Sequence, residues 1–161
     1  MVKTQKEIML YNIHGTILEW LYFIYNESSK ALIQFLMKNF EFDLTPDKHN
    51  NICCYNCENC ENCVMCDYCK NCKNCIFVTS GDNAIDEVTN EEDNCGAEGW
   101  DYNIQRNKFI DDGKIYELND KDIKVLKDIY KSLIDYAHGF KYEEKYINYI
   151  NNSFKDVIDK F

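Results

Sequence analysis

The sequence has little of what redirects a chain or carries catalysis. Its 161 residues include one proline, one arginine, six glycines and three histidines. No phosphate-binding glycine loop is present, and the histidines lack a partner spacing typical of a catalytic site. No apolar run approaches the length of a membrane span, and residues 1–10 lack the basic and apolar regions of a signal peptide. These absences predict a cytoplasmic protein that is not an enzyme.

One stretch lacks positive charge altogether. Residues 76–105 contain no lysine or arginine but eight acids, which account for −8 of the net charge of −10. Their spacing lacks the alternation of a calcium-binding EF-hand loop. Such a charge disfavours direct nucleic-acid binding and favours a basic partner. The candidate partner-binding residues are Asp82, Asp86, Glu87, Glu91, Glu92, Asp93, Glu98 and Asp101.

Cysteine, by contrast, is abundant and regularly spaced. Between residues 54 and 75 it stands at every third position, at Cys54, Cys57, Cys60, Cys63, Cys66, Cys69, Cys72 and Cys75. A helix turns by 100° per residue, so this spacing would wind around its surface. A strand alternates its side chains with period two, so the cysteines would point to opposite sides. The spacing therefore favours a chain that turns a corner every three residues, with each cysteine facing inward.

The residue before each cysteine supports this interpretation. Asparagine precedes cysteine in five of the seven triplets, and asparagine tolerates the left-handed backbone that a corner needs. Four triplets per coil would stack each residue on the one twelve positions later. That register pairs Glu58 with Lys70 and Glu61 with Lys73, whereas three triplets per coil would put Glu58 over Asp67. We therefore expect twelve-residue coils with buried cysteines acting as small apolar groups.

The cysteine tract resembles the short-repeat β-solenoids with cysteine at every third position that occur in proteins of phages and other mobile elements. It is more distantly similar to pentapeptide-repeat proteins. The resemblance covers residues 54–75, and Met65 and Tyr68 depart from the asparagine pattern. It implies a structural role for the cysteines in a two-coil β-solenoid. Some pentapeptide-repeat proteins are acidic and mimic DNA, which is an analogy of fold only.

Metal binding is the main alternative for the tract. Pairs of the form Cys-x-x-Cys are typical of zinc knuckles, and similar spacings occur in iron–sulfur proteins. A tetrahedral site, however, needs two such pairs joined by a loop, and this tract has none. A metallothionein-like cluster and a redox or disulfide role are further alternatives, although disulfides are rare in the cytoplasm. Cys53 and Cys95 lie outside the register.

The flanking segments predict helices and one hairpin. Thr4 and Glu7 form a capping-box pattern, and Asn119 or Asp120 is expected to cap a later helix. Asp112-Gly113 suits the turn of a β-hairpin over residues 108–118. The sequence thus predicts an α+β fold in which helices flank the small two-coil cysteine-lined β-solenoid and the β-hairpin. We expect a single domain over residues 1–161, with the following parts: a helical hairpin (1–45), the cysteine-triplet solenoid (53–79), an acidic loop (80–105), and the hairpin with two helices (106–161).

These features favour non-catalytic binding over catalysis. The hypothesis is an acidic inhibitor from a phage or mobile element, of the anti-CRISPR or anti-defence type. It would use residues 82–101, together with Glu58 and Glu61, to occupy a basic nucleic-acid-binding surface of a host protein. The sequence predicts no cofactor, and the alternative function is zinc or iron–sulfur binding. An open end of the solenoid would expose unpaired backbone groups and so allow a homodimer.

Overall fold

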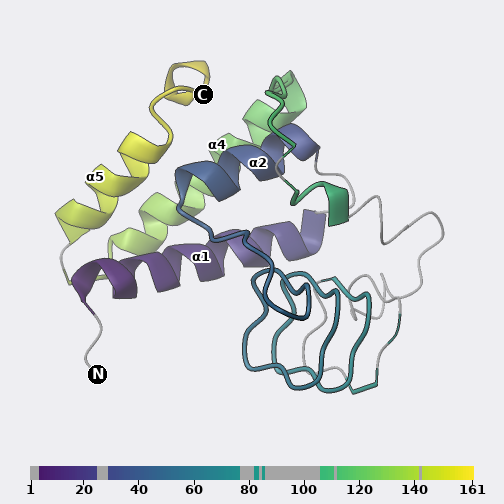
Figure 1. Cartoon of the computed structure of the whole chain (residues 1–161). Helices are drawn as coiled ribbons and strands as arrows, with labels where there is room; N and C mark the ends of the chain where they lie inside the picture. The colour runs from purple at the N-terminus through teal and green to yellow at the C-terminus, as the bar shows by residue number, and fades with distance from the viewer. Residues whose placement is uncertain are drawn as a thin grey trace. The chain divides into compact units, whose positions relative to one another are not determined.

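The computed structural model describes residues 4–24, 29–76, 82–83, 85, 106–110, 112–141 and 143–161. The chain forms two compact units. The helical unit comprises Met1–Glu41 and Lys114–Phe161, and the second unit comprises Phe42–Gly113. Figure 1 shows the labelled helices of the first and the stacked turns of the second. Of the helices in the described residues, none combines the length and apolarity that crossing a bilayer requires.

Helix α1 (Gln5–Ile24) and helix α2 (Lys30–Asn39) begin at hydroxyl caps. The Glu7 amide donates to Thr4 Oγ1 at 3.1 Å, as the capping pattern predicts. The Leu32 amide donates to Ser29 Oγ at the same distance. Each cap satisfies a backbone donor that has no partner within its helix. The buried face of α1 repeats every four residues and consists of Met9, Ile13, Ile17 and Leu21.

Helix α4 (Asp120–Ala137) begins at a reciprocal capping box. Asn119 Oδ1 accepts from the Asp122 amide at 2.8 Å, and Asp122 Oδ2 accepts from the Asn119 amide at 3.1 Å. Asp122 is buried, and its other carboxylate oxygen accepts from Ser29 Oγ at 2.9 Å. One carboxylate therefore ties the beginning of α4 to the beginning of α2, where both helix dipoles favour negative charge.

Aromatic rings form the centre of the helical unit. Phe154 follows α5 (Glu143–Ser153) and precedes the short 3₁₀ helix η1 (Ile158–Lys160). Its ring lies 5.3 Å from the ring of Phe40 and 5.3 Å from that of Tyr130, centroid to centroid, both edge to face. Phe154 is fully buried, so this arrangement adds ring electrostatics to the burial of apolar area. It joins the end of α2 to α4 and to the end of α5.

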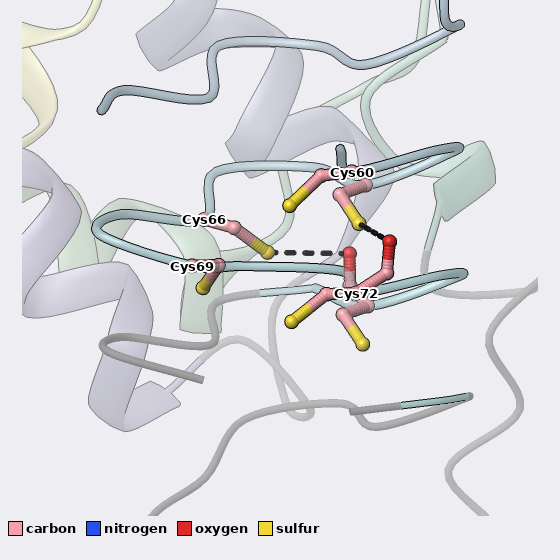
Figure 2. Packing of buried hydrophobic residues seen from close by; sticks show 6 residues of the cluster. Cys60, Cys66, Cys69 and Cys72 are labelled. Carbon is pink, nitrogen blue, oxygen red and sulfur yellow. Dashed lines mark hydrogen bonds between the residues drawn. The ribbon is translucent and has the colours of Figure 1, made fainter. Parts of the chain in front are cut away.

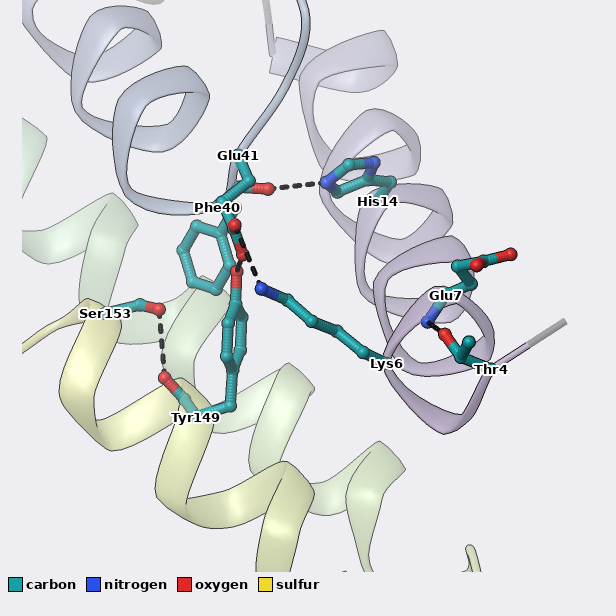
Figure 3. Close-up of polar contacts among 8 residues, drawn as sticks. All are labelled: Thr4, Lys6, Glu7, His14, Phe40, Glu41, Tyr149 and Ser153. Carbon is teal, nitrogen blue, oxygen red and sulfur yellow. Dashed lines mark hydrogen bonds and ion pairs between the residues drawn. The ribbon is translucent and has the colours of Figure 1, made fainter.

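A polar cluster surrounds the end of α2 (Figure 3). Glu41 pairs with Lys6 of α1 at 3.2 Å and accepts from the Tyr149 hydroxyl of α5 at 2.8 Å. His14 Nε2 lies 2.6 Å from the Phe40 carbonyl oxygen, and burial lowers the pKa of His14. Glu41 itself has a φ of 57°, which ends the helical direction of the chain. The cluster therefore fixes the last residue of the helical unit before the chain leaves it.

The second unit contains a coil of stacked twelve-residue turns, which we call the cysteine coil: residues 50–76 with 82, 83 and 85. Each side of a turn meets the next turn through one parallel bridge. At Glu58, for example, the amide donates to the Cys69 carbonyl at 2.9 Å, and the Glu58 carbonyl accepts from the Asn71 amide at 2.9 Å. Bridges join Glu58 to Lys70 and Glu61 to Lys73, so the predicted twelve-residue register is confirmed.

Every third residue of the cysteine coil has a left-handed backbone. Nine consecutive positions, from Asn50 to Asn74 in steps of three, have φ between 51° and 63°. Six of these nine positions are asparagine, and the other three, Cys53, Met65 and Tyr68, keep the same geometry. Met65 and Tyr68 have φ of 55° and 52°, the same conformation as their asparagine neighbours. Cys53 also occupies this slot, with a φ of 51°, which explains why it lies outside the cysteine register.

The predicted α+β class and its β-solenoid are wrong. Among the described residues the regular elements are helices, and the cysteine coil contains only isolated bridges, with no sheet. The reason is the left-handed residue, because it follows each bridge residue and turns the chain before a second extended residue can pair. Three-residue sides are too short to make strands.

The predicted β-hairpin over residues 108–118 is also wrong. Residues 106–109 form a helical turn, in which the Phe109 amide donates to the Arg106 carbonyl at 3.0 Å. Gly113 has the expected left-handed φ of 76°, but the residues after it form no strand in the described part of this segment. Ile115 is 97% exposed, whereas Phe109 is fully buried. The two apolar stretches therefore have different environments and do not act as paired strands.

The coil continues beyond the last cysteine. Asp82 forms a bridge with Lys70, and Ile85 forms one with Lys73. The Asn83 amide donates to the Lys70 carbonyl at 2.9 Å, and Asn83 has a φ of 59°. Asp82 and Asn83, which were predicted to lie in the acidic loop over residues 80–105, therefore belong to a third turn of the coil. The signal was the asparagine of the triplet Asp82-Asn83-Ala84, which keeps the corner residue after cysteine has been replaced.

We predict that Asn119→Ala lowers the free energy of unfolding by about 1 kcal/mol, because the substitution removes the cap of α4. Urea unfolding followed by helical circular dichroism measures the change. Asn152→Ala is the matched control, since Asn152 is an exposed asparagine within α5. Equal effects of the two substitutions would contradict a capping role for Asn119.

Candidate functional site

The cysteines form the interior of the coil. Six are buried, from Cys60 to Cys75, and Cys54 and Cys57 pack against them. Figure 2 shows their sulfur atoms directed into the space that the turns enclose. Ile52, Val64 and Ile76 bridge successive turns along one side of the coil, and all three are fully buried as well. The tract thus fulfils the packing role predicted for its cysteines.

Each thiol of the register has a backbone acceptor. The sulfur of every cysteine donates to the carbonyl two residues earlier, at distances from 3.2 Å for Cys57 to 3.6 Å for Cys54. Cys63 and Cys66 also reach a carbonyl of the next turn, at 3.7 Å and 3.5 Å. A thiol is a weak donor, so these contacts satisfy it without the cost of burying a hydroxyl.

The environment favours the protonated thiol at Cys57, Cys60 and Cys66. Burial raises the pKa of Cys57 to about 12 and also raises the pKa of Cys60. Hydrogen bonding among neighbouring thiols raises the pKa of Cys66 and lowers that of Cys63. Metal binding and nucleophilic attack both require the thiolate. Both reactions are therefore disfavoured at Cys57, Cys60 and Cys66.

The alternatives of metal and disulfide can be compared with this geometry. Among the described residues, no group of three or more histidines, cysteines or acids is placed to hold a metal ion. None of the nine cysteines within the described ranges forms a disulfide bond in the described part of the chain. Each turn holds its cysteines at fixed intervals along rigid sides, so four sulfurs do not gather around one point as a tetrahedral ion requires.

The structure describes only part of the predicted acidic site. Asp82 lies exposed on the third turn, in the same column as Glu58 and Lys70. Glu58 and Glu61 are exposed on the first turn, and each is bridged through its backbone to a lysine of the next. The remaining predicted partner-binding residues and Cys95 lie outside the described residues. These are Asp86, Glu87, Glu91, Glu92, Asp93, Glu98 and Asp101.

The only arginine of the sequence binds two stacked corners of the coil. Arg106 Nη2 donates to the Asn50 carbonyl at 3.0 Å, and Nη1 donates to the Asn62 carbonyl at 3.2 Å. Asn50 and Asn62 are twelve residues apart, and Asn50 Nδ2 also donates to Asn62 Oδ1 at 2.9 Å. A guanidinium group thus spans two turns. Sequence reasoning missed this contact, although the uniqueness of Arg106 in a lysine-rich chain was a signal.

Asn51 is a second residue that sequence reasoning missed. It stands three positions before Cys54 and so continues the inward register with an amide in place of a thiol. Its Nδ2 donates to the Cys60 carbonyl at 2.8 Å, and its Oδ1 accepts from the Cys63 amide at 2.9 Å. Asn51 is buried, and its own amide donates to Asp47 Oδ1 at 3.0 Å. It therefore closes the first turn with hydrogen bonds that cysteine could not make.

Comparison with protein-family models, with curated proteins and with solved structures gives no match for this chain. Its function must accordingly be argued from its own residues. The relevant features are the buried cysteine interior, the regular left-handed corners and the acidic stretch that begins on the third turn.

We predict that the six buried cysteines resist alkylation in the folded protein. A short iodoacetamide pulse near pH 8, followed by peptide mass spectrometry, should leave Cys66 and Cys69 unmodified, whereas all ten cysteines react in denaturant. Elemental analysis of anaerobically purified protein is the companion measurement. Rapid modification of Cys66 and Cys69 without denaturant would contradict their burial. Zinc or iron at one equivalent or more would contradict an interior of protonated thiols.

We also predict that stability falls at alkaline pH. The pKa of Cys57 is raised to about 12 in the folded protein, above the value of about 8.5 for an unfolded cysteine. Its contribution to stability is therefore complete below about pH 8.5 and is lost as the pH rises toward 12. Urea midpoints at about pH 7.5 and 10.5 measure the loss. Cys57→Ala should make this loss smaller, and an equal loss in both proteins would contradict the assignment.

Proposed function

We propose that this protein is a non-catalytic acidic binding protein that competes with nucleic acid for a basic surface of another protein. The observation that supports the proposal is the stretch of residues 76–105, with eight acids and no base. A stretch of one charge sign attracts a surface of the opposite sign and raises the rate of encounter. An inhibitor of a nucleic-acid-binding host protein, of the anti-defence type, is the class that fits this charge.

The cysteine coil supplies a rigid base for the acidic stretch. Asp82, the first acid, is held on the third turn by the bridge to Lys70 and by the hydrogen bond of the Asn83 amide at 2.9 Å. Glu58 lies two turns away in the same column. Turns that pair through backbone bridges are about 4.8 Å apart, so these two acids are spaced by about 10 Å. Such fixed spacing lowers the ordering cost of binding.

The lysines of the second turn offset part of the negative charge on the coil. Lys70 and Lys73 lie between the acids of the first turn and the residues of the third. Their charges offset those of Glu58 and Glu61, so the coil itself contributes little net charge. The excess of negative charge belongs to the acids from Asp82 onward, and the proposal assigns binding to them.

The test is competition for a defined cationic probe. A fluorescent DNA duplex is bound to a lysine- and arginine-rich peptide, and the protein is added at about 50 mM and about 500 mM salt. We expect displacement of the duplex at low salt only. The triple variant Glu91→Gln, Glu92→Gln and Asp93→Asn should displace it several-fold less effectively, because it removes three charges from the acidic stretch.

A matched control removes three charges from the helical unit. Asp128, Asp135 and Asp159 are exposed, and replacing each by asparagine changes the net charge by the same amount. This variant should compete nearly as well as the unmodified protein. Displacement that is insensitive to salt, or equally weakened by both triple variants, would disprove the assignment of binding to the acidic stretch.

A further inference from the structure

Tyr68 is an exposed aromatic residue in a conformation that does not favour it. Its φ is 52°, at a corner where asparagine stands in seven equivalent positions of the coil. A bulky side chain with left-handed backbone is an outlier, since its Cβ crowds the following carbonyl. Tyr68 is nevertheless 62% exposed, so the side chain gains little from packing. A cost without a packing gain points to a role in binding.

Arg106 shows what the corners of this coil can bind. Its guanidinium group donates to the carbonyls of Asn50 and Asn62, two corners stacked twelve residues apart. Asn56 and Tyr68 form another such pair, with φ of 53° and 52°. Their carbonyls should lie in equivalent positions because the backbone conformation and the register are the same. Among the described residues, none donates a hydrogen bond to these two carbonyls.

The surroundings of this pair suit an arginine better than those of the other pairs. Tyr55 and Asp67 precede Asn56 and Tyr68, and Tyr55 is 49% exposed. Asp67 Oδ1 accepts only a long contact of 3.5 Å from Asn56 Nδ2. A carboxylate and the face of a tyrosine are both favourable neighbours of a guanidinium group.

The neighbouring corner pairs lack this combination. Asn59 and Asn71 are bordered on the second turn by lysines on both sides, Lys70 and Lys73. At the pair formed by Cys53 and Met65, the Met65 side chain is buried. These differences distinguish Asn56 and Tyr68 from the two neighbouring pairs.

We propose that Tyr55, Asn56, Asp67 and Tyr68 form a docking site for an arginine side chain of a partner protein. The guanidinium group spans the carbonyls of Asn56 and Tyr68, pairs with Asp67 and stacks on a tyrosine ring. Lysine cannot reproduce this, because its ammonium is a point donor without a planar fork. The inference rests on the proposed function, since it names the chemistry by which a basic partner would be recognised on the coil.

The test is a titration of the isotope-labelled protein, followed by nuclear magnetic resonance, with acetyl-Gly-Arg-Gly-Arg-Gly-amide and its lysine counterpart. The arginine peptide should shift the amide signals of Asn56, Asp67 and Tyr68 and bind at least about threefold more tightly than the lysine peptide. Tyr68→Asn should weaken arginine binding to the level of lysine while raising the urea midpoint, because asparagine relieves the corner. A merely structural tyrosine would not show these opposite changes.

Three further measurements complete the design. Asp67→Asn should weaken arginine binding, and Tyr11→Gln, which changes an exposed tyrosine of α1, should not. The variant with Glu91, Glu92 and Asp93 neutralised should keep its preference for arginine, because the docking site is separate from those acids. Equal binding of both peptides, or full binding by Tyr68→Asn, overturns the docking site but leaves the acidic stretch able to bind. Absence of binding by either peptide at low salt overturns both proposals.

Discussion

The left-handed residue at every third position is the constraint on which the second unit depends. It turns the chain after each bridge residue, so that four short sides close a turn of twelve residues. The same turn directs every third side chain inward and limits each contact between turns to one bridge. A regular strand cannot form under this constraint, because pairing needs consecutive extended residues. Asparagine suits the position since its backbone enters this region at low cost.

The small interior of such a turn explains the choice of cysteine. A thiol fills about the volume of a small apolar side chain, and its hydrogen can reach the carbonyl two residues earlier. Serine would bury a stronger polar group, and alanine would leave space unfilled. Burial raises the pKa of Cys57 and of Cys60, which favours the protonated thiol at these positions, whereas a metal ligand must be deprotonated. Where a stronger hydrogen-bonding group is needed, at the first turn, Asn51 replaces cysteine.

The outer surface of the coil repeats with the same twelve-residue register as its interior. Corner carbonyls stack twelve residues apart, and Arg106 demonstrates that one guanidinium group can join two of them. The charged side chains stack in the same way, with acids on the first turn, lysines on the second and Asp82 on the third. A residue that departs from the corner pattern, such as Tyr68, therefore affects both the local backbone conformation and the exposed surface.

The period of the coil, its twelve-residue register, the inward cysteines and the caps at Thr4 and Asn119 could be predicted from the sequence, since each depends on neighbours along the chain. The lack of strands in the coil was not predicted, because it follows from the backbone angle of every third residue. The hairpin predicted over residues 108–118 does not form, since Phe109 is buried and Ile115 is exposed, and a local pattern of residues does not encode this difference. Two contacts are seen only in the folded chain: Arg106 binds two corners 44 and 56 residues away, and Asp122 joins two helix termini. Contacts of that separation depend on how distant segments pack, and no local pattern encodes them.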